Sequence, residues 1–196
     1  MADADHQQLP RIPLETERLL LRDFALDDWP AVHEYARRLE VARFMTWGPN
    51  TVADTQAFVR RATVSRDEDP RRDHELAVVE KSTGRLVGGC GITIDAGPHR
   101  NAFLGYCLHP DVWGRGYATE ASRALLRFGF LTLGAHRVWT TCDPENHASA
   151  RVLQKIGMRQ EGHLREDVWV RGQWRDELIL AVLDPEWQAL TRSGEL

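Results

Sequence analysis

Residues 113–120 read Trp-Gly-Arg-Gly-Tyr-Ala-Thr-Glu, and the rest of the chain is organised around this stretch. The alternating apolar residues of 103–108 before it predict a strand, and the apolar residues of 117–133 recur at helical spacing. The glycines therefore lie on a strand-to-helix turn. Gly114 and Gly116 let the backbone approach a ligand closely, and the first amides of the next helix have no partner within it. Such a helix start suits a phosphate or pyrophosphate.

The order of elements after this turn carries a family resemblance. A second strand is expected at 137–142, and a short helix is expected between Asn146 and Gly157. With the turn, this order resembles the GNAT superfamily of acyl-CoA-dependent N-acetyltransferases, in particular the RimJ/RimL-type group that acetylates ribosomal-protein N-termini. The similarity covers nearly the whole chain. In its signature, Gln/Arg-x-x-Gly-x-Gly/Ala, the small positions are Gly116 and Ala118 here, and Trp113 replaces the first residue.

The resemblance implies a fold and a cosubstrate. The expected fold is α/β (α+β): a mixed, mostly antiparallel, twisted sheet of about seven strands, flanked by about four helices. The strand ending at Leu108 is expected to splay from its parallel neighbour and open a slot for the acyl-pantetheine of acetyl-CoA, with no metal. The backbone amide of Leu108 is the expected oxyanion donor. The implied cofactor-binding residues are Cys107, Leu108, His109, Trp113, Gly114, Arg115, Gly116, Tyr117, Ala118, Thr119, Asn146 and Ser149.

The catalytic residues are implied less completely. Many superfamily members carry a tyrosine where this chain has Leu153, so a phenolic acid at that position is excluded. The resemblance implies that Ser149, three residues after Asn146, assists the leaving thiolate. The same spacing also predicts that Asn146 caps the helix, and both roles can hold. Glu166 and, beyond the hairpin turn, Asp176 are candidates for the general base through water, or simply solvated carboxylates.

Two further features of the sequence each allow two interpretations. Met45 and Trp47 lie between the first two expected helices, a region that overhangs the acceptor in related enzymes; each is a substrate contact or an ordinary packing residue. Asp176 is placed with them as a substrate-binding candidate. Glu120 matches the family, and it can also serve the helix start through the helix dipole.

Composition sets the remaining expectations. The 196 residues suit one domain, predicted at 14–196 after a flexible tail at 1–13. The net charge of −4 gives no basic footprint for nucleic acid, and no apolar run is long enough for a membrane helix. The cysteines Cys90, Cys107 and Cys142 lie in apolar runs without metal-ligand spacing, which is typical of buried thiols in a reducing compartment. A cytoplasmic monomer or homodimer is expected.

The predicted function is transfer of an acetyl group from acetyl-CoA to a primary amine, the N-terminal α-amine of a protein or peptide. One alternative is a small-molecule acceptor such as an antibiotic, a polyamine or an amino acid. Another is a non-catalytic acyl-CoA-binding module. A doubly wound nucleotide-binding domain would need the glycine turn after an early strand, whereas here it follows four strand-like runs.

Overall fold

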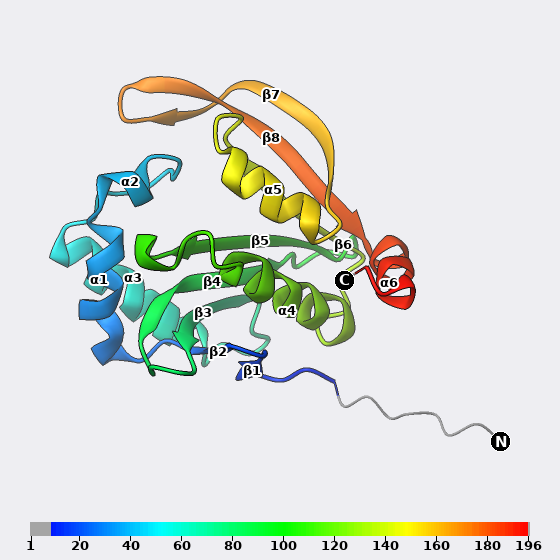
Figure 1. Cartoon of the computed structure of the whole chain (residues 1–196), viewed down its shortest axis with the longest axis horizontal. Coiled ribbons are helices and arrows are strands. Elements are labelled where there is room, and N and C mark those ends of the chain that lie inside the picture. The colour runs from blue at the N-terminus through cyan, green and yellow to red at the C-terminus, as the bar shows by residue number, and fades with distance from the viewer. Residues whose placement is uncertain (1–8, 196) are drawn as a thin grey trace.

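The computed structural model describes residues 9–195, in which one eight-stranded sheet has the order β1-β2-β3-β4-β5-β6-β8-β7 (Figure 1). Neighbouring strands are antiparallel except β5 and β6, which are parallel. The predicted mixed, mostly antiparallel sheet is confirmed, with β1 as a short additional edge strand. The strands are β1 (Leu14–Glu15), β2 (Leu19–Asp23), β3 (Asp73–Glu80), β4 (Leu86–Ile94), β5 (Asn101–Leu108), β6 (Arg137–Cys142), β7 (Arg159–Val170) and β8 (Gln173–Leu183).

Helices cover both faces of the sheet in the described part of the chain (Figure 1). Six are α-helical where about four were expected, in part because the first predicted helix is divided into two; the short C-terminal helix that the sequence predicts after the last strand is present. They are α1 (Trp29–Ala36), α2 (Leu39–Ala42), α3 (Val52–Ser65), α4 (Tyr117–Leu131), α5 (His147–Lys155) and α6 (Asp184–Ser193). Single 3₁₀ turns occur at Leu26–Asp28 and Pro110–Val112.

The strand alternation divides the core into two layers. On one face, Leu76 and Leu104 pack with Leu125 of α4 in the larger cluster. On the other face, Ala77 packs with Tyr35 of α1 and other residues of α1 and α3. We call the first the α4 face and the second the α1 face. Side chains one residue apart in a strand therefore belong to different chemical environments.

The parallel pair β5–β6 is joined along only part of its length. Residues 101–103 pair with 137–139, and the pairing stops there although β5 continues to Leu108 and β6 to Cys142. Beyond that point β6 pairs only with β8. The expected splay is thus present, and it leaves one edge of β5 open from Leu104 onward.

Other boundaries differ from the predictions. The residues of 168–174 predict two strands joined by a turn at Arg171-Gly172; the first of them, β7, already begins at Arg159, because the hairpin with β8 is longer than this pattern predicts. Of the predicted tail 1–13, residues 1–8 lie outside the described residues. The carbonyl of Pro10 accepts a 2.7 Å hydrogen bond from the Thr132 hydroxyl, and Ile12 packs on the larger core cluster. The packed part of the chain therefore starts before residue 14.

Candidate functional site

The glycine turn ends in a helix start that has no side-chain cap. Gly114 and Gly116 have φ of 75° and 82°, a conformation that favours glycine, and Gly116 is the N-cap residue of α4. Among residues 9–195, no side chain forms a capping hydrogen bond at this helix start. Those amides sit at the positive end of the helix dipole and suit an anion.

A large open cavity borders this helix start. Its volume is about 710 Å³, and it extends from Gly116 and Thr119 along α4 to the end of α5 on one side and to the segment 10–18 on the other. Cationic side chains outnumber acidic ones in its lining: the cations are Arg11, Arg18, Arg123, Arg127 and Lys155, and the acids are Glu15, Glu17 and Glu120. A basic cavity beside free helix amides fits a ligand that carries several phosphates.

Ion pairs hold the turn against the first strands. Glu120 accepts hydrogen bonds from the Thr16 hydroxyl at 2.6 Å and the Arg18 amide at 2.8 Å, and its other oxygen pairs with the Arg18 guanidinium at 2.6 Å. Tyr117 donates to Glu80 at 2.6 Å. Glu120 therefore anchors α4 on the connection between β1 and β2, which favours a structural role for it.

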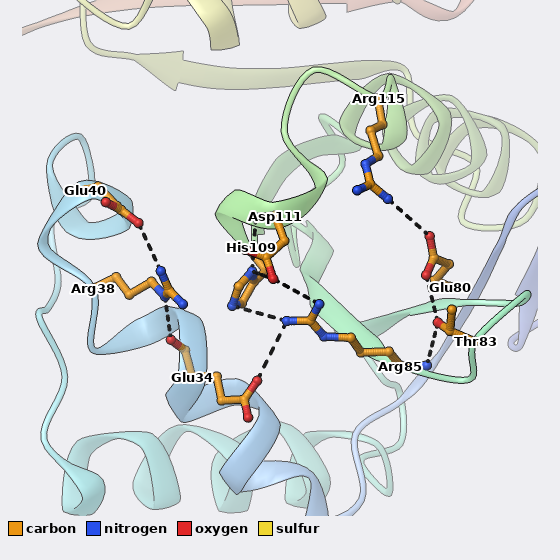
Figure 2. A network of polar contacts seen from close by, with 9 residues as sticks. All are labelled: Glu34, Arg38, Glu40, Glu80, Thr83, Arg85, His109, Asp111 and Arg115. Carbon is orange, nitrogen blue, oxygen red and sulfur yellow. Dashed lines mark hydrogen bonds and ion pairs between the residues drawn. The ribbon is translucent and has the colours of Figure 1, made fainter.

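A second network supports the turn from below (Figure 2). The Arg85 guanidinium lies between Asp111 at 3.1 Å, Glu34 of α1 at 3.8 Å and the buried His109 ring at 3.3 Å. His109 Nδ1 accepts from the Asp111 amide at 3.1 Å, and burial lowers the pKa of this histidine. The His109 side chain thus stabilises the loop between β5 and α4, which is a structural role and not that of a phosphate ligand.

The backbone of β5 presents amides to its open edge. The His109 amide donates to the Val87 carbonyl at 2.8 Å, and the backbone N–H of His109 therefore points toward β4. The backbone N–H and C=O groups of successive residues point alternately to the two edges of a strand. Those of Leu108 and Tyr106 therefore point away from β4, toward the edge of β5 that is not paired with β6. The Leu108 carbonyl already accepts from the Trp113 indole at 2.8 Å. Its N–H is directed at the slot, where an oxyanion donor is expected.

Ser149 and an unpredicted tyrosine meet on the α4 face of the slot. The Asn146 side chain accepts from the Ser149 amide at 3.1 Å, so Asn146 caps α5. The Ser149 hydroxyl lies 2.8 Å from the Tyr106 hydroxyl, which comes from the open part of β5. Burial raises the pKa of Tyr106 to about 12, which keeps the phenol protonated. Tyr106 was missed because it looks like one more apolar residue of its strand.

Glu166 and Asp176 lie together on the outer hairpin. Glu166 is exposed, has φ of 52°, and sits where the register between β7 and β8 shifts. Glu166 is two residues before Val168, and strand alternation predicts that both face the same side; the bulge breaks this alternation. Asp176 accepts from the Glu166 amide at 2.9 Å and from His163 at 2.7 Å, and these bonds lower its pKa. A carboxylate so engaged is a weak base.

One arginine ties the region of Met45 and Trp47 to the hairpin tip. The Arg171 guanidinium donates to the carbonyls of Ala42, Met45 and Gly48 at 2.6, 3.0 and 2.8 Å. Trp47 remains 38% exposed beside it. A cavity of about 450 Å³ separates α2 from the hairpin and is lined by Leu39, Glu40, Arg43, Arg171 and Arg175.

The α1 face of the slot carries two half-buried acids that sequence reasoning did not select. Burial raises the pKa of Glu75 on β3 to about 7 and also raises the pKa of Glu177 on β8. The thiol of Cys107 on this face has a pKa raised by burial to about 12, so it is not a thiolate at neutral pH. Among the described residues, no group of three or more His, Cys, Asp or Glu side chains is arranged to hold a metal ion, and no helix is long and apolar enough to span a membrane.

Comparison with known proteins places this site in context. Residues 18–159 match the family model described as an acetyltransferase (GNAT) domain. The uncharacterized N-acetyltransferase YnaD of Bacillus subtilis is 34% identical over 89% of this chain and 98% of its own. The [ribosomal protein uS5]-alanine N-acetyltransferase of Escherichia coli is 31% identical over 91% of this chain and 94% of its own. The spermidine N(1)-acetyltransferase of E. coli is 24% identical over 86% and 88%.

Solved structures of acetyltransferases superpose on this chain over most of its length. A GNAT-family acetyltransferase from Bacillus anthracis superposes with a TM-score of 0.76 at 34% identity, over 87% of this chain and 98% of its own. RimJ from Mycobacterium smegmatis, solved in complex with CoA-disulfide, superposes with a TM-score of 0.74 at 25% identity, over 90% of each chain.

Proposed function

The chain belongs to the acetyltransferase (GNAT) family, and from that premise we propose that it transfers the acetyl group of acetyl-CoA to the N-terminal α-amine of a protein or peptide. The observation that carries the proposal is the separation of β5 from β6 beside an uncapped helix start. The open edge of β5 offers backbone amides to an acyl chain, and the start of α4 offers backbone amides to phosphates. Such a pair of sites suits acetyl-CoA.

The donor half of the site follows from these amides. The first-turn amides of α4 are proposed to hold the pyrophosphate, and Arg123 and Lys155 in the adjoining cavity are proposed to meet the remaining phosphate. When bound, the thioester supplies an activated acetyl group. The Leu108 amide is proposed to stabilise the negative charge on its carbonyl oxygen, and Ser149 to give a hydrogen bond to the departing sulfur. Metal is not part of this proposal.

The charge around α2 favours a peptide acceptor over a polyamine. Arg43, Arg171 and Arg175 line the cavity between α2 and the hairpin, against one acid, Glu40. Arg43 and Arg175 also pair with Glu145 and Asp143, each at 3.5 Å, so the acids here are matched by arginines and leave no surplus negative charge for a polycation. The guanidinium groups suit backbone carbonyls or carboxylates of a peptide. The exposed Trp47 and the edge-to-face pair Trp169–Trp174 add aromatic surface nearby. A small-molecule amine is the second candidate, favoured by Glu75 on the α1 face, which is unpaired among the described residues.

We expect peptides to be the better substrates. A tetrapeptide beginning with Ala or Ser should show a kcat/KM about tenfold or more above that of spermidine, because the matched acids around α2 deny a polycation a Coulombic gain of order 1 kcal/mol. Release of CoA thiol, measured with both amines at equal ionic strength, gives the ratio. A higher kcat/KM for spermidine would assign the protein to the small-molecule alternative. No CoA release with any amine, together with tight CoA binding, would leave only the acyl-CoA-binding module.

The helix start gives a prediction about CoA affinity. Gly116→Ala adds a methyl group where the phosphates are proposed to approach, and we expect CoA to bind about tenfold more weakly by calorimetry. Gly134→Ala is the matched control. Gly134 has φ of 66° and follows the other end of α4, so its variant meets the same left-handed strain, of order 1 kcal/mol, far from the proposed site. Equal CoA affinity in both variants would remove the α4 amides from the site.

A further inference from the structure

Glu75 is a half-buried carboxylate without a partner. It lies on β3 and faces the α1 side of the sheet. Among residues 9–195, no side chain or amide forms a hydrogen bond or ion pair with its carboxylate, although burying a charge unpaired is costly. A fold that retains such a group at a loss of stability indicates a use for it.

A row of glycines gives this carboxylate room to reach across the sheet. Glu75 is opposite Gly91 on β4, which in turn is opposite Gly105 on β5. A Cβ on Gly91 would lie only 2.9 Å from a carboxylate oxygen of Glu75, so the side chain folds directly over this glycine. Gly105 likewise carries no side chain between the carboxylate and the open edge of β5.

This row leads to the point where β5 and β6 separate. The last paired residue of β5 is Phe103, and Gly105 is two residues beyond it, so the carboxylate lies level with the start of the slot. Adjacent strands are about 4.8 Å apart, which places a group over β4 within one water molecule of the β5 edge. Tyr106, next to Gly105, directs its side chain to the opposite face, toward Ser149.

We propose that Glu75 is the acceptor-side carboxylate: it binds the ammonium group of the substrate and, after that group has lost one proton to solvent, takes the second proton from the attacking amine. This assignment rests on the proposed function and adds to it the position of the base. The amine nitrogen forms a bond to the acetyl carbon on the α1 face, the bond from that carbon to sulfur breaks, and the amine proton passes to Glu75, directly or through one water. The sulfur receives a proton on the other face, beside Ser149.

The groups that face Glu75 are compatible with this role. They are Asp73 on the same strand, Arg61 of α3, the Tyr35 hydroxyl of α1 and the Cys90 thiol of β4, and burial keeps the last two neutral. Asp73 is bonded by Thr93 at 2.8 Å, and none of the four forms an ion pair with Glu75 among the described residues. A carboxyl group whose pKa is close to neutral can accept a proton and return it to solvent within a turnover.

The test replaces Glu75 with glutamine, which keeps the shape and removes the charge. We expect Glu75→Gln to lower kcat/KM for the Ala- or Ser-starting tetrapeptide by about 10²-fold or more while CoA affinity stays the same. In the wild type, log kcat/KM should rise with pH with a slope of about 2 below pH 7, because both Glu75 and the amine must lose a proton. The slope should fall to about 1 in the variant. Glu177→Gln, which alters the other half-buried acid of this face, is the matched control.

A binding measurement separates failure of this proposal from failure of the proposed function. Calorimetry of the tetrapeptide with CoA-saturated protein at pH 8 should show at least tenfold weaker binding to Glu75→Gln than to the wild type. If the wild type releases no CoA with any amine, the proposed function fails, and this binding ratio still decides on Glu75. Unchanged peptide affinity and an unchanged pH slope in Glu75→Gln, or the losses appearing in Glu177→Gln instead, would overturn the assignment.

Discussion

Ser149→Ala is expected to lower kcat by about 10²-fold, a typical contribution of a proton donor positioned at a leaving group. The Ser149 hydroxyl lies at the start of α5, 2.8 Å from the Tyr106 phenol, on the α4 face of the slot. A serine has little acidity of its own, and the protonated phenol behind it can resupply the proton. CoA affinity should change little, because the phosphate contacts proposed at α4 lie elsewhere.

The structure also gives a clear expectation for the alternative in which Ser149 only stabilises the first turn of α5. The cap bond of α5 runs from the Ser149 backbone amide to Asn146, so it survives in the alanine variant. Ser149→Ala should therefore melt within a few degrees of the wild type, whereas loss of the cap itself costs about 1 kcal/mol. Tyr106→Phe keeps the ring and removes the relay, and a drop of roughly tenfold in kcat is expected. A normal kcat for Ser149→Ala would leave protonation of the thiolate to solvent.

Glu75→Gln is expected to stabilise the fold at alkaline pH while it impairs activity. Burial raises the pKa of Glu75 from 4.5 to about 7, so the folded state binds more protons than the unfolded state between these values. The contribution of the protonated Glu75 to the free energy of unfolding is complete below pH 4.5, falls between pH 4.5 and pH 7, and is lost above pH 7. With 1.36 kcal/mol per pKa unit, the loss at pH 8 reaches up to about 3 kcal/mol.

Glutamine carries no charge at any pH, so the Glu75→Gln variant does not lose this free energy of unfolding at high pH. Denaturant unfolding at pH 5 and pH 8 should show a stability difference between variant and wild type that grows by up to about 3 kcal/mol at the higher pH. A gain in stability with a loss of turnover is the expected signature of a functional group. A variant that is less stable at pH 8 and equally active would instead mean that the carboxylate has a structural partner.

The elements around the glycine turn could be predicted from the sequence because their signals are local. Strand β6 at 137–142 and the start of α4 at Tyr117 were placed correctly, since each shows its own period and a turn or cap beside it. The α4 helix is slightly shorter than the predicted 117–133. The splay between β5 and β6 came from the family resemblance and not from the residues, because pairing between distant segments leaves no local pattern.

The acid–base groups of the candidate site could not be predicted in this way. Glu75 and Gly91 are opposite each other only through the β3–β4 register, and the raised pKa arises from burial under α1 and α3. Glu166 was selected from its place in an alternating strand, and the bulge in β7 breaks that alternation. Tyr106 and Ser149 are separated by 43 residues. Each depends on tertiary structure that the local sequence does not encode.

The gap between β5 and β6, beside the start of α4, is the proposed binding site of acetyl-CoA. A crystal structure of the complex tests it most directly. The predicted result has the pyrophosphate on the amides of residues 114–119, the pantetheine along the open edge of β5, and the thioester between Ser149 on one face and Glu75 on the other. Acetyl-CoA bound elsewhere, with β5 and β6 closed against each other along residues 104–108, would contradict it.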